Sequence, residues 1–232
     1  MPNPPATKKE LFSRLRNIIQ HGWYEMPDTP RNAGTGGPSN FLEDLLGLNV
    51  GKRDIPDSVC WEIKYFTADT NLITLFHKEA QPPNIMRYMV SKWGWKDAQG
   101  RLSFRHTIAG KSDRFRVDSD GNQIVVRPVK GNGPVPYWTH DELLNIAGGK
   151  IRRMVLVKGE RTGRKVRYLQ ADCYENLHIG FFIYELVRGT IRIDFDVREA
   201  KPGSKGLRNH GTKFRVSPDD VCRLYTKKER LG

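Results

Sequence analysis

Residues 59–66 and 190–198 show the clearest pattern in the chain, an alternation in which every second side chain is apolar. Successive side chains of a β-strand point to opposite faces, so this pattern predicts two strands that each bury one face. In the first strand, the face opposite the apolar one carries Cys60, Glu62, Lys64 and Phe66. Apolar runs predict further strands at residues 72–76, 152–157 and 165–169, the last two joined by a turn at residues 159–163.

Helical spacing follows a different period. The segment Thr7-Lys8-Lys9-Glu10 fits a capping box, and it precedes an apolar stripe of Leu11, Leu15, Ile18 and Ile19. Shorter helices are predicted at residues 41–46, at 84–93, from about residue 139 onward, and at 175–187. This mixed order, without repeats or a long linker, predicts one α/β (α+β) unit over residues 1–232.

Charge is distributed unevenly over the 232 residues. The chain holds 39 Lys and Arg against 26 Asp and Glu, a formal net charge of +13. Residues 1–100 contribute 12 basic and 11 acidic side chains, whereas residues 101–232 contribute 27 and 15. Such a basic half favours a polyanionic partner, most often nucleic acid, over the alternative of a solvated basic surface.

Two absences narrow the class of protein. No run of about 18 apolar residues is present, so no membrane span is predicted, and the polar N-terminus does not have the apolar core of a signal peptide. The three cysteines, Cys60, Cys173 and Cys222, are far apart and odd in number. They fit neither a disulfide framework nor a zinc clip, and we expect a reducing cytoplasm.

The residue run from Asp57 to Lys64 carries the candidate chemistry. Glu62 and Lys64 share one face of the predicted strand, and Asp57 follows a proline at its entrance, where a turn brings its carboxylate towards Glu62. Two carboxylates aimed at one point suit Mg²⁺, and an adjacent ammonium can position water and offset charge on phosphorus. The pattern therefore predicts phosphodiester hydrolysis; the alternative is an exposed ion pair of little energetic weight.

Three other acidic positions are weaker candidates. Glu199 and Lys201 repeat the acid-x-Lys spacing without an upstream Pro-Asp, which indicates a chance match. Glu43 lies on the helix before the strand, but Asn40 to Glu43 also fits a capping box. Asp54 is better explained as a turn residue than as a metal ligand.

The chain resembles the MvaI/BcnI family of type II restriction endonucleases, which is related to the MutH-like branch of the PD-(D/E)XK nucleases. The resemblance spans roughly residues 20–217, and its segments keep the same order. They are Gly22-Trp23-Tyr24-Glu25, Gly34-Thr35-Gly36-Gly37, Phe41-Leu42-Glu43-Asp44-Leu45-Leu46, Asp54-Ile55-Pro56-Asp57, Glu62-Ile63-Lys64, Leu72-Ile73-Thr74-Leu75-Phe76-His77-Lys78, Tyr137-Trp138 and His210-Gly211-Thr212-Lys213-Phe214-Arg215-Val216.

The resemblance implies a Mg²⁺-dependent enzyme that cleaves double-stranded DNA at a short site of the CC-N-GG kind. It implies a monomer that nicks one strand and then the other, with Asp57, Glu62 and Lys64 handling metal and water and Glu43 as an auxiliary acid. The implied fold is a restriction-endonuclease-like mixed central sheet flanked by helices, with two lobes and a DNA-binding cleft. We expect a catalytic lobe of roughly residues 1–85 and 150–200 and a recognition lobe of roughly residues 86–149 and 201–232.

The resemblance also implies that His77 and residues 210–215 read bases, although the sequence alone equally allows a structural role for His77 at the end of a strand. Physical chemistry agrees, since Arg215 offers two donors to guanine and His210 or Lys213 can donate to the same edge. Arg208 adds to the nearby phosphate contacts. Lys213 stands where BcnI-like members carry a second histidine, whereas His77 is BcnI-like, so the preference for the central base is left open.

Two alternatives remain from the sequence. One is a MutH-like endonuclease that nicks DNA during repair, and the other is a non-catalytic, basic DNA-binding module. The intact set of Asp57, Glu62 and Lys64 argues against the second. Whether a cognate DNA methyltransferase accompanies the protein in its host is also left open.

Overall fold

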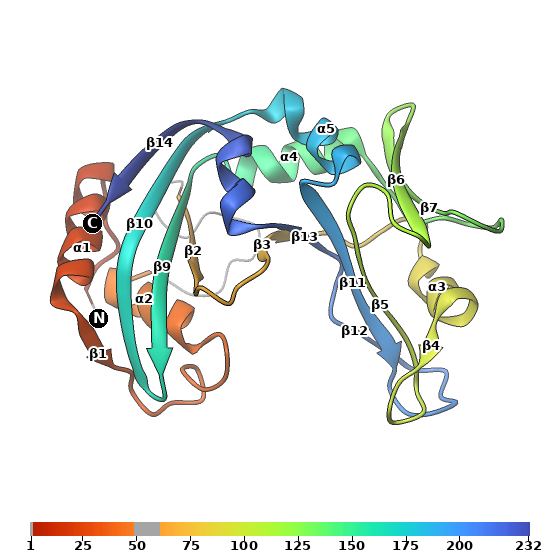
Figure 1. Cartoon of the computed structure of the whole chain (residues 1–232), viewed down its shortest axis with the longest axis horizontal. Helices are drawn as coiled ribbons and strands as arrows, with labels where there is room; N and C mark the ends of the chain where they lie inside the picture. The colour runs from red at the N-terminus through yellow and green to blue at the C-terminus, as the bar shows by residue number, and fades with distance from the viewer. Residues whose placement is uncertain (1, 49–60) are drawn as a thin grey trace. The chain divides into compact units, whose positions relative to one another are not determined.

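The computed structural model describes residues 2–48 and 61–232. It divides into two compact units (Figure 1). Unit 1 comprises Met1–Ile73, Ile146–His178 and Val221–Gly232, and unit 2 comprises Thr74–Asn145 and Ile179–Asp220. Helices and strands alternate through both units, which confirms the predicted mixed α/β class.

Unit 1 is built on a five-stranded sheet with the order β1-β10-β9-β2, and β14 also pairs with β10. Strand β2 runs parallel to β9, while the other pairs are antiparallel. The short helix η2 (Pro218–Leu224) leads into β14. The remaining elements are α1 (Lys8–His21), β1 (Trp23–Glu25), α2 (Gly37–Leu46), β2 (Glu62–Phe66), β9 (Met154–Thr162), β10 (Lys165–Leu177) and β14 (Tyr225–Leu231).

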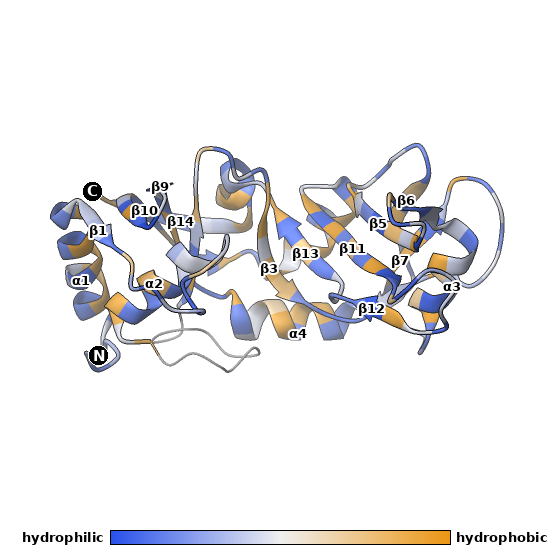
Figure 2. Cartoon of the chain, turned by 90° about the horizontal axis from the view of Figure 1, so that it is seen from below, coloured by the Kyte–Doolittle hydropathy of each residue, from blue (hydrophilic) through white to orange (hydrophobic). Residues whose placement is uncertain are grey.

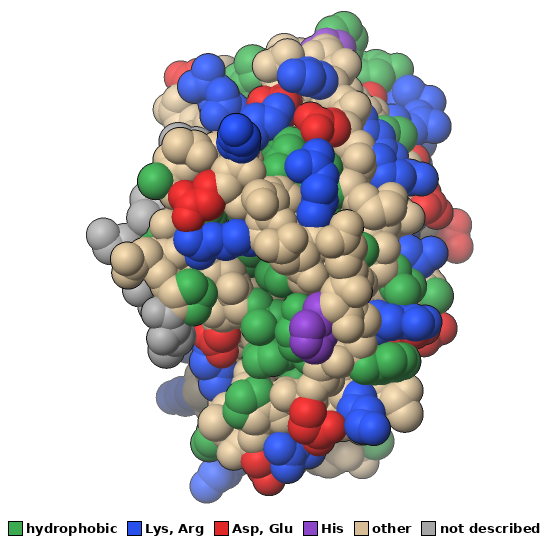
Figure 3. Space-filling view, turned by 90° about the vertical axis from the view of Figure 1, so that its left-hand side faces the viewer, with side chains coloured by type: hydrophobic (Ala, Val, Ile, Leu, Met, Phe, Trp, Pro, Cys, Tyr) green, Lys and Arg blue, Asp and Glu red, His purple; other side chains and the backbone are tan. Residues whose placement is uncertain are grey.

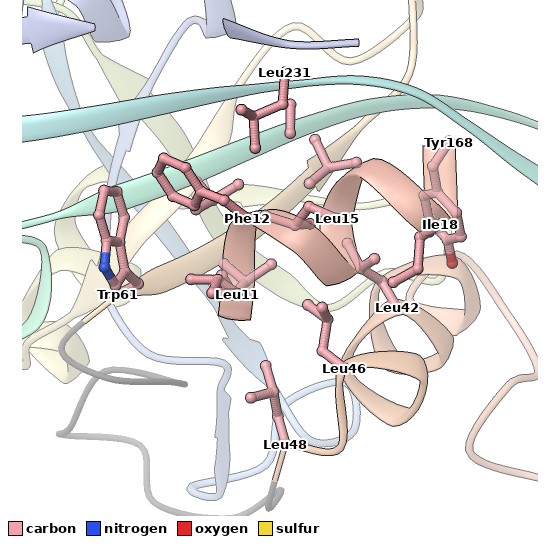
Figure 4. Packing of buried hydrophobic residues seen from close by; sticks show 14 of the residues in the cluster. Leu11, Phe12, Leu15, Ile18, Leu42, Leu46, Leu48, Trp61, Tyr168 and Leu231 are labelled. Atoms are coloured by element: carbon pink, nitrogen blue, oxygen red, sulfur yellow. The ribbon is translucent and has the colours of Figure 1, made fainter. Parts of the chain in front are cut away.

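The core of unit 1 lies where α1 and α2 pack on the sheet (Figure 4). The Phe12 ring meets the fully buried Trp61 edge to face, with ring centroids 5.4 Å apart. Each fully buried side chain of this size contributes about 1.5–3 kcal/mol to folding. The labelled members are Leu11, Phe12, Leu15, Ile18, Leu42, Leu46, Leu48, Trp61, Tyr168 and Leu231.

The N-terminus of α1 confirms the predicted cap. Thr7 Oγ1 accepts a hydrogen bond from the backbone N–H of Glu10 at 3.2 Å. The Glu10 carboxylate accepts from the backbone N–H of Ala6 at 2.9 Å, one residue earlier than an ideal capping box requires. Two of the donors at the start of the chain's first helix are thereby satisfied.

The buried Asp172 links β14 to β10 in unit 1. Its carboxylate accepts from Arg230 Nε at 2.7 Å and lies 2.9 Å from Lys228 Nζ. Figure 3 shows the face with α1 and β1, where Lys and Arg are interspersed with Asp and Glu. The basic side chains of this face are thus partly balanced by neighbouring carboxylates.

Unit 2 contains a six-stranded sheet with the order β3-β13-β11-β5-β4, in which β12 pairs with β11, and a three-stranded sheet β6-β7-β8. In β11 every second residue is buried, which confirms the predicted alternation and is visible as alternating colours in Figure 2. The strands are β3 (Ile73–His77), β4 (Trp95–Lys96), β5 (Leu102–Ile108), β6 (Phe115–Asp120), β7 (Gln123–Pro128), β8 (Tyr137–Thr139), β11 (Ile191–Glu199), β12 (Leu207–Asn209) and β13 (Lys213–Val216).

Helices α3 (Ile85–Trp93), α5 (Phe182–Arg188) and η1 (Ile179–Phe181) belong to unit 2. Helix α4 (His140–Lys150) begins in unit 2 and ends in unit 1. The helices predicted near residues 84 and 139 are therefore confirmed. The helix predicted at residues 41–46 is also confirmed, although α2 begins earlier, at Gly37.

The predicted helix at residues 175–187 is wrong in its first half. Strand β10 continues to Leu177 because it pairs with β9 on one side and with β14 on the other, and a short η1 then precedes α5. The predicted hairpin is confirmed, but its turn lies at residues 163–164, so residues 159–162 extend β9. In both places, pairing within the sheet extends a strand beyond the residues that the local sequence pattern predicts.

The boundaries of the two compact units differ from those of the predicted lobes. Residues 179–200 fall in unit 2, and residues 221–232 fall in unit 1 because β14 pairs with β10. Which unit is catalytic and which recognises DNA stays a prediction at this point.

Candidate active site

Glu62 begins β2, where this strand joins the sheet of unit 1. Its backbone N–H donates to Arg153 O at 3.0 Å, and it is paired in register with Met154 of β9. The residue is only 1% exposed. A buried carboxylate costs several kcal/mol unless a cation or donors compensate it. The cations and hydrogen-bond donors around Glu62 therefore have to compensate the cost of burying its carboxylate.

Lys64 lies two residues further along β2, and its side chain shares the face of Glu62. Lys64 Nζ is 2.5 Å from Glu62 Oε1, and the two side chains are 24% and 2% exposed. Because the carboxylate is buried, this is not the solvent-exposed ion pair that the alternative interpretation assumes. Within this ion pair, the Glu62 carboxylate is buried, whereas the Lys64 side chain is partly open to solvent.

Lys150, at the C-terminus of α4, is a second cation at the same carboxylate. Its Nζ is 3.4 Å from Glu62 Oε2, and its side chain is 12% exposed. Sequence reasoning missed this residue, since a lysine at a helix C-terminus is already explained by the helix dipole. Only the fold brings Lys150 to Glu62.

Tyr225 fixes the backbone next to Lys150. Its hydroxyl donates to Ile151 O at 2.6 Å, and the residue is 7% exposed. Burial, with a smaller contribution from the Glu62 carboxylate, raises the pKa of Tyr225 well above its ordinary value. The hydroxyl therefore stays protonated and keeps its role as donor.

The remaining predicted acids have different outcomes. Asp57 and Asp54 lie outside the described residues. Glu43 lies on α2, and its Oε2 is 3.0 Å from Arg31 Nη2. The capping interpretation of Asn40 is wrong, because α2 begins at Gly37 and the Asn40 amide donates to Arg31 O instead.

Glu199 is held by the protein's own backbone. Its Oε2 accepts from the N–H of Leu102 at 2.8 Å and from the N–H of Gly203 at 3.2 Å. These bonds fix the end of β11 and the loop that follows it. The structure thus gives Glu199 a structural role, in keeping with a chance match of the acid-x-Lys spacing.

The predicted DNA-reading residues all lie in or beside one sheet, that of unit 2. His77 ends β3, Arg208 lies on β12, and Lys213 and Arg215 lie on β13. His210 donates its backbone N–H to Asp196 O of β11 at 2.9 Å. Residues distant in the sequence are therefore brought together as the prediction requires, although their contact with DNA stays a prediction.

Ion pairs with β11 orient the two cations of β13. Arg215 Nη1 is 3.1 Å from Asp194 Oδ2, and Lys213 Nζ is 3.5 Å from Asp196 Oδ2. Each carboxylate lies on the solvent-facing side of β11, next to the residue it orients. Such pairs restrict the rotamers of long side chains, which lowers the entropy lost on binding.

Gly211 lies beside His77. A Cβ at Gly211 would be 3.3 Å from His77 Cδ2, and its φ of +81° favours glycine. The position therefore combines a left-handed backbone with a close approach of the imidazole.

Arg198 is a further cation that sequence reasoning missed. It is paired in register with Arg208, and within the described ranges neither guanidinium has a hydrogen-bond or ion-pair partner. Burial together with Arg101, Arg105 and Arg208 lowers the pKa of Arg198. No pattern in the sequence predicts this cluster, since it depends on the pairing of β5, β11 and β12.

The family model described as the MvaI/BcnI restriction endonuclease family matches residues 12–225. The chain belongs to this family. It is a type II restriction endonuclease, a site-specific enzyme that cleaves DNA. No curated protein matches the chain in sequence.

Two solved structures of MvaI resemble this restriction endonuclease. A complex of MvaI with its cognate DNA substrate has a TM-score of 0.77 at 23% identity, covering 95% of each chain. MvaI in the absence of DNA has a TM-score of 0.56 at 22% identity, covering 100% of each chain. The predicted fold class is thereby confirmed as that of MvaI.

Restriction endonucleases of this family generally use divalent metal ions. Over residues 2–48 and 61–232, no group of three or more His, Cys, Asp or Glu side chains could hold one. Glu62 nevertheless supplies carboxylate oxygens of the kind that a hard divalent cation prefers, and a cation bound there would compete with the ammonium groups of Lys64 and Lys150.

No helix in the described part of this endonuclease is long and apolar enough to cross a membrane.

Proposed function

We propose that this restriction endonuclease hydrolyses double-stranded DNA at a short CC-N-GG-like site in a Mg²⁺-dependent reaction. The observation that carries the proposal is the buried Glu62 with Lys64 Nζ 2.5 Å away on the same strand. Family membership supports DNA cleavage, and a similar structure is a complex of MvaI with its cognate DNA substrate. Together they favour this chemistry over a structural role for the pair.

In this proposal Glu62 and Asp57 hold Mg²⁺, and Glu43 is the auxiliary acid. A bound divalent ion makes water more acidic and offsets negative charge on a phosphate oxygen. Lys64 has the more exposed end of the pair, so its ammonium can donate to the attacking water or to the scissile phosphate. Glu62 orients that ammonium from its buried side.

DNA recognition is assigned to unit 2. His77, Arg208, His210, Lys213 and Arg215 are proposed to contact the duplex, with Arg215 reading a guanine edge and Arg208 a phosphate. Unit 1 is then the catalytic unit, because it contains Glu43, Glu62 and Lys64. We further propose that the enzyme acts as a monomer in a reducing cytoplasm and nicks the two strands one after the other.

The test is cleavage of a supercoiled plasmid that carries a single CC-N-GG site, with Mg²⁺, followed by mapping of both 5′ ends. We expect an open-circular intermediate that converts to a linear product with ends at the site. A plasmid in which one guanine of the site is replaced is the matched control. Nicks that never become double-strand breaks would indicate a MutH-like nickase, and fragments at unrelated positions would contradict the proposed site.

A further inference from the structure

The Glu62 carboxylate is held at both of its oxygens. Lys64 Nζ lies 2.5 Å from Oε1, and Lys150 Nζ lies 3.4 Å from Oε2. One buried carboxylate therefore faces two ammonium groups, although a single cation would balance its charge. The second cation calls for an explanation beyond charge neutralisation.

The two lysines differ in exposure and in support. The Lys64 side chain is 24% exposed, whereas that of Lys150 is 12% exposed. Lys150 is also fixed through its neighbour Ile151, whose N–H donates to Ala147 O at 2.9 Å and whose carbonyl accepts from Tyr225 at 2.6 Å. Lys150 is therefore the more confined of the two cations.

Segment 150–153 and β2 are also joined directly. The backbone N–H of Glu62 donates to Arg153 O at 3.0 Å, so the strand that carries Glu62 and the segment that follows α4 are held together. These bonds hold the backbone on both sides of the contact, so Lys150 Nζ can leave Glu62 only by rotation of its own side chain, which is 12% exposed. Lys150 therefore approaches Glu62 from the end of α4, whereas Lys64 lies on the same strand as Glu62.

We propose that Lys150 is a positioning residue of the active site, which stays paired with Glu62 when Lys64 turns towards the DNA. A lysine that serves the attacking water or the phosphate loses part of its contact with Glu62. A second cation that does not move with Lys64 keeps the buried carboxylate in its orientation. Lys150 supplies that cation, and this assignment rests on the proposed function.

The test compares Lys150→Met with wild type at saturating Mg²⁺ on a cognate duplex. We expect kcat to fall about 10–100-fold, the range seen when a group that orients a first-sphere ligand is removed, with KM changed by less than about threefold. Affinity for the duplex without divalent ion, measured by fluorescence anisotropy, should also stay within about threefold. Lys150→Arg should recover most of the lost kcat.

Lys8→Met is the matched control. Lys8 Nζ lies 2.5 Å from Glu175, so this variant also removes a lysine from a carboxylate of unit 1, on the outer helix α1. Its kcat should stay within about threefold of wild type. If Lys150→Met does not fold, Lys150→Gln carries the same test, because its amide can still donate to Glu62 without charge.

The outcomes separate this inference from the proposed function. If Lys150→Met keeps its kcat while Glu62→Gln abolishes cleavage, the role of Lys150 is overturned and the proposed function stands. If Glu62→Gln still cleaves DNA, the proposed active site itself fails. A rise in KM and a loss of affinity with unchanged kcat would make Lys150 a DNA contact and would also overturn the positioning role.

Discussion

Arg198 of β11 and Arg208 of β12 are directly opposite each other in an antiparallel ladder. Like charges at such positions destabilise a sheet, typically by a few tenths of a kcal/mol to about 1 kcal/mol. Across the described part of the chain, neither guanidinium is paired with a carboxylate. An anionic ligand would relieve this repulsion, and in a DNA-cleaving enzyme the phosphate backbone is the obvious candidate.

Arg198→Ala and Arg208→Ala should each weaken DNA binding and reduce the slope of log K against log salt by about 1. Stability should be unchanged or slightly higher, because repulsion is removed. Fluorescence anisotropy at several salt concentrations and urea unfolding measure the two effects. Arg116→Ala is the control, since Arg116 pairs with Asp118 on β6. Unchanged affinity together with reduced stability would assign the pair a structural role.

Arg215→Ala should cost about 1–3 kcal/mol of discrimination at one position of the site, as expected for the loss of a bidentate contact to guanine. The Asp194 carboxylate, 3.1 Å from Arg215 Nη1, holds the guanidinium ready for that contact. Cleavage rates on duplexes with single substitutions at each position measure the effect. A uniform loss on all duplexes, with a smaller salt slope, would make Arg215 a phosphate contact instead.

Asp172→Asn should destabilise the protein by about 1–2 kcal/mol at pH 7, because the hydrogen bonds to Arg230 and Lys228 lose their charge. This figure is modest because both basic side chains are partly exposed. Cleavage should be unaffected, since Asp172 lies between β10 and β14. Urea unfolding of both proteins at pH 7 gives the value.

The same pair of proteins provides a pH test. Burial would raise the pKa of Asp172, but the hydrogen bonds from Arg230 and Lys228 outweigh it and lower that pKa below its ordinary value. The stabilisation is therefore complete above the unfolded pKa of about 3.9 and is lost as pH falls through the folded pKa. The difference between wild type and Asp172→Asn should shrink as pH is lowered from 7 towards 3. A difference that stays constant would exclude ionisation of Asp172 as its source.

Gly149→Ala should stabilise the protein by about 0.5–1 kcal/mol. Gly149 is in the last turn of α4, and a Cβ added there meets nothing within 4 Å, so the helical preference of alanine is gained without a clash. Gly189→Ala is the opposite case, with φ +93° and a Cβ 2.7 Å from Ala109 C. Thermal unfolding should show opposite shifts, and a destabilised Gly149→Ala would contradict the prediction.

Local signals predicted the elements that short-range physics controls. Thr7 and Glu10 mark the start of α1 because capping depends on neighbours in the sequence. Alternation predicted β11 because one face of the strand packs on the core and the other faces solvent. The segment after residue 175 could not be predicted in this way, because β10 is extended by β14, whose residues lie at the end of the chain.

The residues of the candidate site also differ in whether the sequence could predict them. Glu62 and Lys64 were predictable because a strand of period 2 puts them on one face. Lys150 was not, since its contact with Glu62 depends on where α4 ends and where β9 begins. Arg198 was missed for a similar reason, because only the register of β11 with β12 shows that it faces Arg208.

The most direct test of the account measures both the cleavage activity and the DNA affinity of Lys64→Met and compares them with those of wild type. Fluorescence anisotropy without divalent ion gives the Kd for a cognate duplex, and end-mapped cleavage with Mg²⁺ gives the rate. The account predicts a Kd within about threefold of wild type and a rate lower by at least about 100-fold, in the range expected for loss of a transition-state donor. Cleavage at the wild-type rate would contradict the assignment of Glu62 and Lys64 as the catalytic pair.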